Sequence, residues 1–258
     1  MIDFFKQIII FFYKIWPRPF GIGYNQYKIR LIKKIIKNKK IILDKYIDER
    51  IVEIPWIIRN LTLKKNYKIL DAGCTLNFNY LIKKILKNNN KLNFINIFPE
   101  KNIYKSDSVK YHTQDISNIE FTSNYFDSVT CLSVIEHIGF DNSIYDQSKD
   151  EKIIKINRNL YKKALLELKR VLKPDKWLYL TFPFGKKMIF KNYQQFDYKD
   201  LQNILEIFSP KEYLFEFYKY ENFKWNKVND ENCKYSEAIY KNDVGISSTS
   251  VALVKMKK

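Results

Sequence analysis

From residue 68 onward, short apolar runs alternate with longer amphipathic stretches, and this alternation restricts the fold more than any other feature of the sequence. Short apolar runs are typical of strands buried on both faces of a sheet, whereas apolar residues at helical spacing are typical of helices that cover a sheet. The alternation therefore predicts a mostly parallel sheet with helices on both faces. The predicted strands are 67–70, 92–97, 109–112, 128–132 and 177–182, and the predicted helices between them are 79–87 and 154–171.

The C-terminal part of the sequence has a different pattern. After a predicted helix at 198–208, the segments 212–220 and 248–256 are both predicted as strands, and no full helix stands between them. Strands that follow each other without a crossover helix pair antiparallel. With the five strands above, these two complete a predicted α/β fold whose mostly parallel, seven-stranded sheet has an antiparallel edge strand.

The first 62 residues are predicted to be helical, with breaks at 16–24 and near Pro55. We expect an N-terminal helical extension at 1–62 and an α/β domain at 63–258. One face of the first helix is apolar, but the run is too short to cross a bilayer, and it lacks the small residues of a signal-peptide cleavage site. We favour a helix that packs on the body of the protein; the alternative is a peripheral membrane contact through residues 1–20.

The formal charge is +18, from 46 Lys and Arg against 28 Asp and Glu. Such an excess often marks a nucleic-acid partner, because basic side chains release counterions from phosphates. Here the lysines are spread over the whole sequence, so nucleic acid is not the expected partner. Three cysteines, at 74, 131 and 233, give neither a disulfide framework nor metal-ligand spacing. We therefore expect no metal site and a cytoplasmic location, and no motif bears on the oligomeric state.

The segment Lys-Ile-Leu-Asp-Ala-Gly-Cys-Thr at 68–75 is a predicted strand that ends in an acidic residue and a glycine. In open α/β sheets, ligands bind at the carboxyl ends of the strands, where a tight turn lets backbone amides approach a nucleotide cofactor. Further motifs follow in order: Asp115 after the third strand, 125–137 across the fourth and 165–185 across the fifth. The set predicts a cofactor cleft at the carboxyl end of the first strand.

Four segments in this set resemble class I S-adenosylmethionine-dependent methyltransferases of the type 11 group. They are Leu-Asp-Ala-Gly-Cys, Phe-Asp-Ser-Val-Thr, Ser-Val-Ile-Glu-His-Ile and Glu-Leu-Lys-Arg-Val-Leu-Lys-Pro, and the resemblance covers about residues 66–185. It implies that 63–258 is a Rossmann-like methyltransferase domain and that S-adenosylmethionine is the cofactor. A dehydrogenase is an alternative interpretation of the turn by itself, but the segments Glu-His-Ile and Val-Leu-Lys-Pro suit a methyltransferase better.

The resemblance also implies the cofactor site. Asp71 orders the turn near the methionine amino group, Asp115 binds the exocyclic amine of adenine, and the amide of Ile116 meets the adenine ring. Ser133 lines the sulfonium end, although its hydroxyl could instead cap a helix that starts at Val134. The predicted cofactor-binding residues are Asp71, Gly73, Cys74, Asn77, Asn96, Asp115, Ile116 and Ser133.

Two departures from the family pattern keep an alternative open. Thr75 and Asn77 stand where the second and third glycines of the turn would be, and Asn96 stands where an acidic residue grips the ribose. Asn tolerates a positive φ, so Asn77 could substitute for glycine. An amide lacks the charge that strengthens a carboxylate hydrogen bond. The alternative is therefore a degenerate, non-catalytic Rossmann-like binding module.

Glu136 and His137 follow the fourth strand and are the candidates for acid-base catalysis, because His titrates closest to neutral pH. A base is needed only if the acceptor is a hydroxyl that must lose its proton. Loops beyond the fourth and fifth strands should face the substrate. The predicted substrate-facing residues are Asp141, Asn142, Tyr145, Gln194 and Gln195.

The predicted function is methyl transfer to a small-molecule or glycan acceptor, on oxygen in preference to nitrogen or carbon. The glycan preference rests on a resemblance of the Asp-Ala-Gly-x-x-Leu-Asn turn, and of the Pro-Glu at 99–100, to methyltransferases of bacterial polysaccharide biosynthesis. An RNA methyltransferase is a further alternative suggested by the charge, but the sequence has no recognisable appended RNA-binding motif.

Overall fold

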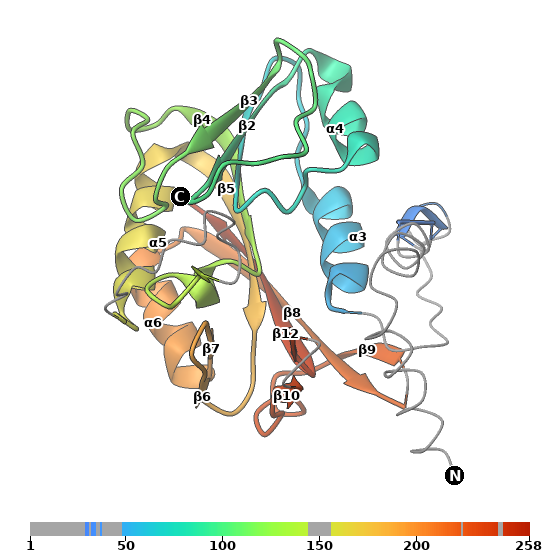
Figure 1. The fold of residues 1–258 in the computed structure, drawn as a ribbon, viewed down its shortest axis with the longest axis vertical. Coiled ribbons are helices and arrows are strands. Elements are labelled where there is room, and N and C mark those ends of the chain that lie inside the picture. The colour runs from blue at the N-terminus through green and yellow to red at the C-terminus, as the bar shows by residue number, and fades with distance from the viewer. Residues whose placement is uncertain are drawn as a thin grey trace.

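An eight-stranded sheet runs through the described part of the chain in the order β3-β2-β1-β4-β5-β12-β8-β9 (Figure 1). The computed structural model describes residues 29–30, 32–34, 37, 48–143, 156–222, 224–241 and 245–258. The predicted first helix, with its two interpretations, lies outside these residues, and so does Tyr145. No helix within them is both long and apolar enough to cross a bilayer.

Five parallel strands form the first part of the sheet, and each overlaps a predicted strand. The central strand β4 (Phe126–Leu132) is buried at every position, as expected of a strand covered on both faces, and this includes its polar residues Asp127, Ser128 and Thr130. Both of its neighbours pair with it in parallel. The five strands are β1 Lys68–Ala72, β2 Lys91–Asn96, β3 Val109–Thr113, β4 Phe126–Leu132 and β5 Leu172–Pro183.

The C-terminal strands form the antiparallel edge that the sequence predicts. β12 (Ser250–Lys257) pairs antiparallel with both β5 and β8 (Glu212–Glu221). β9 (Lys224–Val228) then pairs antiparallel with β8, so the sheet has one strand more than the seven predicted. β9 was not predicted from the sequence, because the strand is short and polar and buries only Trp225.

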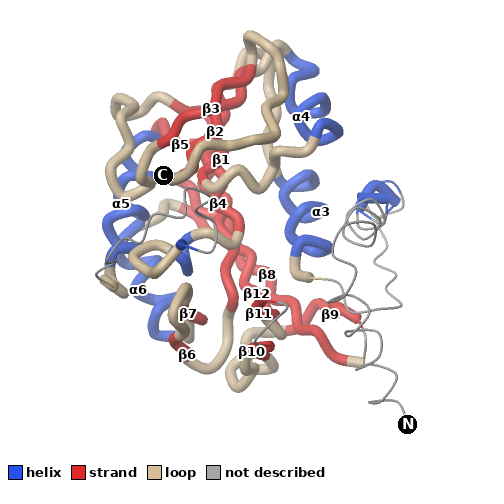
Figure 2. The backbone as a smooth tube through the Cα atoms, viewed as in Figure 1, coloured by secondary structure: helices blue, strands red, loops and turns tan. Residues whose placement is uncertain are grey.

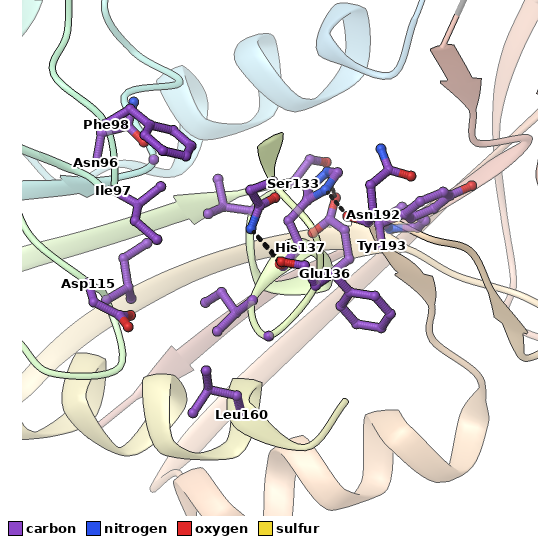
Figure 3. A pocket seen from close by; sticks show the side chains of 18 of the residues that line it. Asn96, Ile97, Phe98, Asp115, Ser133, Glu136, His137, Leu160, Asn192 and Tyr193 are labelled. Carbon is purple, nitrogen blue, oxygen red and sulfur yellow. Dashed lines mark hydrogen bonds and ion pairs between the residues drawn. The ribbon is translucent and has the colours of Figure 1, made fainter. Parts of the chain in front are cut away.

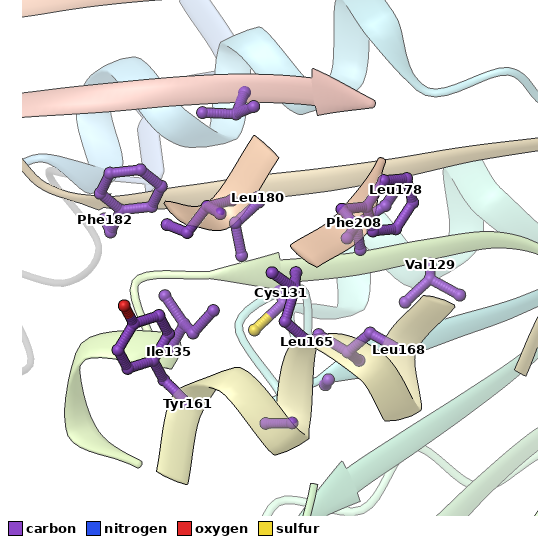
Figure 4. Close-up of a cluster of buried hydrophobic side chains, with 14 of the residues drawn as sticks. Val129, Cys131, Ile135, Tyr161, Leu165, Leu168, Leu178, Leu180, Phe182 and Phe208 are labelled. Carbon is purple, nitrogen blue, oxygen red and sulfur yellow. The ribbon is translucent and has the colours of Figure 1, made fainter. Parts of the chain in front are cut away.

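Two layers of helices cover the sheet (Figure 2). α5 (Leu160–Val171) and α6 (Tyr198–Phe208) pack on one face, where their apolar side chains meet those of β4 and β5 (Figure 4). α3 (Arg50–Asn60) and α4 (Asn79–Ile85) pack on the other face. The strong cores on both faces confirm the predicted α/β architecture.

The predicted helix bounds hold to different degrees. The helix at 198–208 is confirmed, and Asp197 and Asp200 form a capping box at its start. The prediction at 79–87 covers α4 and the short 3-10 helix η1 (Leu86–Asn88). In the described residues the helix predicted from 154 begins only at Leu160, because the amide of Asn157 donates to the Gly139 carbonyl at 2.8 Å.

α3 runs through Pro55 without interruption, so the break predicted there is wrong. The proline removes one helical hydrogen bond, and burial of the neighbouring Ile51, Ile54 and Ile57 offsets that loss. These side chains share one core with β1, β2 and α4. The proposed boundary at residue 62 therefore marks a change of sequence pattern and does not separate α3 from the packing of the sheet.

Two short two-stranded ribbons and one further 3-10 helix lie near the carboxyl ends of the parallel strands. They are β6 Met188–Ile189 with β7 Gln194–Gln195, β10 Ile239–Lys241 with β11 Gly245–Ser247, and η2 Ile135–His137.

Candidate active site

A cavity of about 530 Å³ opens at the carboxyl ends of β1, β2 and β4, where ligands bind in open α/β sheets (Figure 3). One wall comes from the segments after β2 and β3, and the opposite wall from η2 and the β6–β7 turn. The N-terminal end of α3 closes a third side. The cavity is therefore built from both of the predicted units.

Asp71 fixes the turn after β1 through two side-chain hydrogen bonds. Its Oδ2 accepts from the Leu76 amide at 2.7 Å, and its Oδ1 accepts from the Thr130 hydroxyl at 2.6 Å. Burial raises the pKa of Asp71 to about 6, although both hydrogen bonds favour the charged form. Asp71 is fully buried and does not line the cavity, so its contact with a ligand runs through the turn that it holds.

Gly73 is the part of this turn that lines the cavity. Its φ is 102°, and a Cβ there would lie 2.1 Å from Cγ2 of Val134. Cys74 takes the left-handed conformation that the sequence analysis assigned to Asn77, with a φ of 56°. The expectation of a positive φ at Asn77 is therefore wrong, because the turn already reverses at 73–74.

The residues that replace the missing glycines bind the protein itself. The hydroxyl of Thr75 donates to the Leu132 carbonyl at 2.9 Å. The side chain of Asn77 donates to the Asn102 carbonyl at 2.9 Å and accepts from the Tyr111 hydroxyl at 2.8 Å. Asn77 and Cys74 do not line the cavity, and burial raises the pKa of the Cys74 thiol. The turn is closed by these contacts without further glycines.

Asn96, Asp115 and Ile116, three predicted cofactor residues, do lie together on the first wall. Asn96 is the last residue of β2, and Asp115 is exposed at the rim, where its Oδ1 accepts from the Ser117 amide at 2.7 Å. Phe98 also lines this wall and was not predicted. An aromatic ring beside a polar pair suits a nucleobase and a ribose.

Ser133 lines the middle of the cavity, but its hydroxyl caps no helix. It donates instead to Oε1 of Glu53 on α3 at 2.5 Å, and the Thr181 hydroxyl donates to the same oxygen at 2.5 Å. Nη1 of Arg50 donates to Oε2 of Glu53 and to the Leu132 carbonyl, each at 2.8 Å. α3 is thus fixed by charge and hydrogen bonds to the ends of β4 and β5.

The contribution of α3 to the cavity was not predicted from the sequence. Arg50 and Glu49 line the cavity, and Glu53 lies fully buried behind them. Burial and the neighbouring Glu53 raise the pKa of Glu49 to about 7. Burial alone would lower the pKa of Arg50, but the surrounding carboxylates outweigh it and raise that pKa. The signal was present as four charged residues at 48–53, where the otherwise apolar stretch 51–58 begins.

The second wall carries both predicted acid-base residues. Nδ1 of His137 lies 2.8 Å from the Asn192 carbonyl oxygen. A carbonyl only accepts, so Nδ1 carries the proton and the neutral ring has its lone pair on Nε2. Burial lowers the pKa of His137 to about 4, so the ring is neutral at physiological pH.

Glu136 lies beside this ring, with Oε1 at 4.0 Å from Nε2 of His137. Its side chain is 2% exposed, and Oε2 has no hydrogen-bond partner among the described residues. Burial raises the pKa of Glu136 well above its usual value. A buried, incompletely bonded carboxyl in a cleft is a strong candidate for contact with a ligand.

The predicted substrate-facing residues fall into two groups, those that line the cavity and those that do not. Asn142 lines the cavity and donates to the His137 carbonyl at 3.0 Å. Asp141 lies outside it and pairs with Lys191 at 3.0 Å. Gln194 and Gln195 are buried, so the expectation that they face this cavity is wrong. Their side-chain amides donate hydrogen bonds to backbone carbonyls of neighbouring segments, as buried amides normally do.

Residues 70–180 match the type 11 family model described as a methyltransferase domain. No curated protein matches the chain.

Solved structures with a similar fold share little sequence. A chain of the Haloferax volcanii complex between the Trm112 methyltransferase activator and its methyltransferase partner is 9% identical, with a TM-score of 0.50 over 80% of this chain and 88% of that one. A SAM-dependent methyltransferase from Methanosarcina mazei is 16% identical, with a TM-score of 0.48 over 78% of this chain and 96% of that one. The [4+2]-cyclase SpnF is 14% identical, with a TM-score of 0.45 over 62% of this chain, and the match spans 57% of SpnF.

The fold, the cavity at the carboxyl ends of the strands and the matched segment define a class I S-adenosylmethionine-dependent methyltransferase domain. Residues 70–180 match the type 11 group of that class, whose cofactor is S-adenosylmethionine. The residues present fit this cofactor. The wall with Asn96, Asp115 and Ile116 suits the adenosine, and Gly73 and Ser133 line the path from there to His137.

Proposed function

We propose that this protein transfers the methyl group of S-adenosylmethionine to a hydroxyl oxygen of a small molecule or glycan. When bound, the cofactor supplies an electrophilic methyl group on a sulfonium. The preference for a hydroxyl acceptor rests on the orientation of His137. Its Nδ1 donates a hydrogen bond to the Asn192 carbonyl at 2.8 Å. That hydrogen bond leaves Nε2 as the ring atom able to accept a proton from an acceptor hydroxyl.

The low pKa of His137, about 4, sets the size of this contribution. A general base works best when its pKa is close to the working pH, and a weaker base gives less. We therefore expect His137 to contribute at the low end of general-base catalysis, about 10²-fold. Alignment of acceptor and methyl group by the walls of the cavity supplies the larger part.

The proposed glycan acceptor and the proposed cytoplasmic location rest on separate observations. The glycan rests on the resemblance of the turn at 71–77 to methyltransferases of polysaccharide biosynthesis. A reducing compartment such as the cytoplasm is supported by Cys74, Cys131 and Cys233, which are all free thiols. Contact of residues 1–20 with a membrane stays a prediction.

The test is methyl transfer from methyl-tritiated S-adenosylmethionine to a panel of sugars and small alcohols. His137→Gln should lower kcat by about 10²-fold, because the amide cannot take the proton. His112→Gln is the matched control, since His112 is the only other histidine and bonds Asn93 on β2. Equal losses in both variants, or none in His137→Gln, would contradict a base at His137. Absence of cofactor binding would instead favour the non-catalytic binding module.

A further inference from the structure

The charges that line the cavity run opposite to those of the whole chain. The chain has 46 Lys and Arg against 28 Asp and Glu. Among the described residues that line the cavity, three are acidic, namely Glu49, Asp115 and Glu136, and one, Arg50, is basic. An excess of acidic groups in this cavity, within a strongly basic chain, favours a cationic ligand.

Arg50 does not supply the missing positive charge. Its guanidinium is paired with Glu53, a fourth acidic residue, at 2.8 Å. Glu53 disfavours the charged form of Glu136 more than Arg50 favours it. The cluster of Arg50 with its three glutamates therefore favours the neutral carboxyl of Glu136 in the empty cavity, and an added positive charge would stabilise its carboxylate form.

Glu136 also lacks a donor. Glu136 lines the cavity, and its Oε2 is buried without a partner among the described residues, although a buried carboxyl oxygen normally has one. An ammonium group offers three N–H donors together with a positive charge. Phe140 and Tyr193 also line the cavity, and aromatic rings attract cations.

Glu136, the side chain that would bind a cation, lies on the side of the cavity assigned to the methyl acceptor and not on the side assigned to the adenosine. Glu136 lies next to His137, Asn192 and Tyr193, across the cavity from Asn96 and Asp115 (Figure 3). From these observations we propose that the methyl acceptor carries an ammonium group, as an amino sugar or another small amino alcohol does, and that Glu136 binds this group. The inference rests on the proposed function, because it names the chemical class of its acceptor.

The roles of neighbouring residues follow from this assignment. Glu136 binds the ammonium group and so orients the acceptor, while the nearby hydroxyl faces Nε2 of His137. Glu49, on the rim formed by α3, adds attraction for the same charge. Phosphorylated or carboxylated acceptors are excluded, because they would place like charges beside Glu136 and Glu49.

The test uses the intact protein saturated with S-adenosylhomocysteine and titrated calorimetrically with two matched series. One series is glucosamine, glucose and glucose 6-phosphate; the other is ethanolamine, ethylene glycol and glycolate. We expect the amine in each series to bind at least about tenfold tighter than the neutral compound, with no binding of the anion. Equal binding of the neutral compounds, or no binding of either amine, overturns the proposal. Failure to bind S-adenosylhomocysteine would instead contradict the proposed function.

A variant pair localises the effect. Glu136→Gln keeps the size of the side chain and should reduce the preference for amine over neutral compound to less than about twofold. Glu206→Gln makes the same change on the exposed side of α6 and should keep the full preference. A retained preference in Glu136→Gln would overturn the assignment to Glu136. If Glu136→Gln does not fold, the comparison of amine with neutral compound in the unmodified protein still decides.

Discussion

The carboxylate of Glu53 accepts a hydrogen bond from the Ser133 hydroxyl at 2.5 Å, although 80 positions separate the two residues in the sequence. The same oxygen accepts from Thr181, and the other oxygen is paired with Arg50. One side chain of α3 thus fixes the ends of β4 and β5 and holds Arg50 at the cavity wall. The cavity and α3 are therefore a single structural unit.

Glu53→Gln should lower the free energy of unfolding by about 3 kcal/mol, because it leaves the Arg50 guanidinium without its carboxylate partner. Urea denaturation measures the change. Glu206→Gln, on an exposed position of α6, should change stability by less than about 0.5 kcal/mol. Similar small values for both variants would show that the Glu53 cluster does not stabilise the fold.

Gly73→Ala should destabilise the protein and abolish cofactor binding, because the new methyl group would overlap Val134 in a backbone conformation with φ of 102°. We expect a loss of about 3 kcal/mol, of which the strained backbone accounts for about 1–2 kcal/mol. Val134→Ala in the same chain should recover the part that comes from overlap. A double-mutant cycle measures this coupling, and strictly additive losses would contradict the contact.

Asp71→Asn should remove a pH-dependent cost of burial. The pKa of Asp71 is raised from 3.8 unfolded to about 6 folded, so stability from this group is complete below pH 4 and is lost as the pH rises through 6. The asparagine variant should therefore match the parent protein near pH 4 and exceed it by about 3 kcal/mol at pH 7. Denaturation of both proteins from pH 4 to 8 isolates the effect. A difference that does not grow with pH would contradict a raised pKa.

Gln195→Leu tests the structural role of a residue that the sequence suggested for substrate binding. Its amide donates to the Lys186 carbonyl at 2.9 Å and to the Ser236 carbonyl at 2.8 Å. Loss of both donated hydrogen bonds should cost about 2–3 kcal/mol, while affinity for S-adenosylhomocysteine stays the same. Gln202→Leu, exposed on α6, is the control. Weakened binding with unchanged stability would return Gln195 to the site.

The parts of this molecule that sequence predicts are those fixed by local pattern. β4 is predictable from the short run of strand-forming residues at 128–132, and Asp71, Gly73 and Asp115 are predictable because they stand at strand ends. The role of Glu53 was out of reach, because its partners Ser133 and Thr181 lie 80 and 128 positions away. A polar residue at a strand end, such as Gln195, looks the same in sequence whether it faces a ligand or a buried carbonyl.

Titration of the intact protein with S-adenosylhomocysteine, repeated on Asp115→Ala, tests directly whether the cavity holds the cofactor in the proposed orientation. Asp115 lies on the wall assigned to the adenosine, and Glu120→Ala, exposed five residues later, is the control. We predict saturable binding by the intact protein and by the control, and at least about tenfold weaker binding by Asp115→Ala. No binding by the intact protein at millimolar ligand, or equal binding by all three proteins, would contradict this assignment.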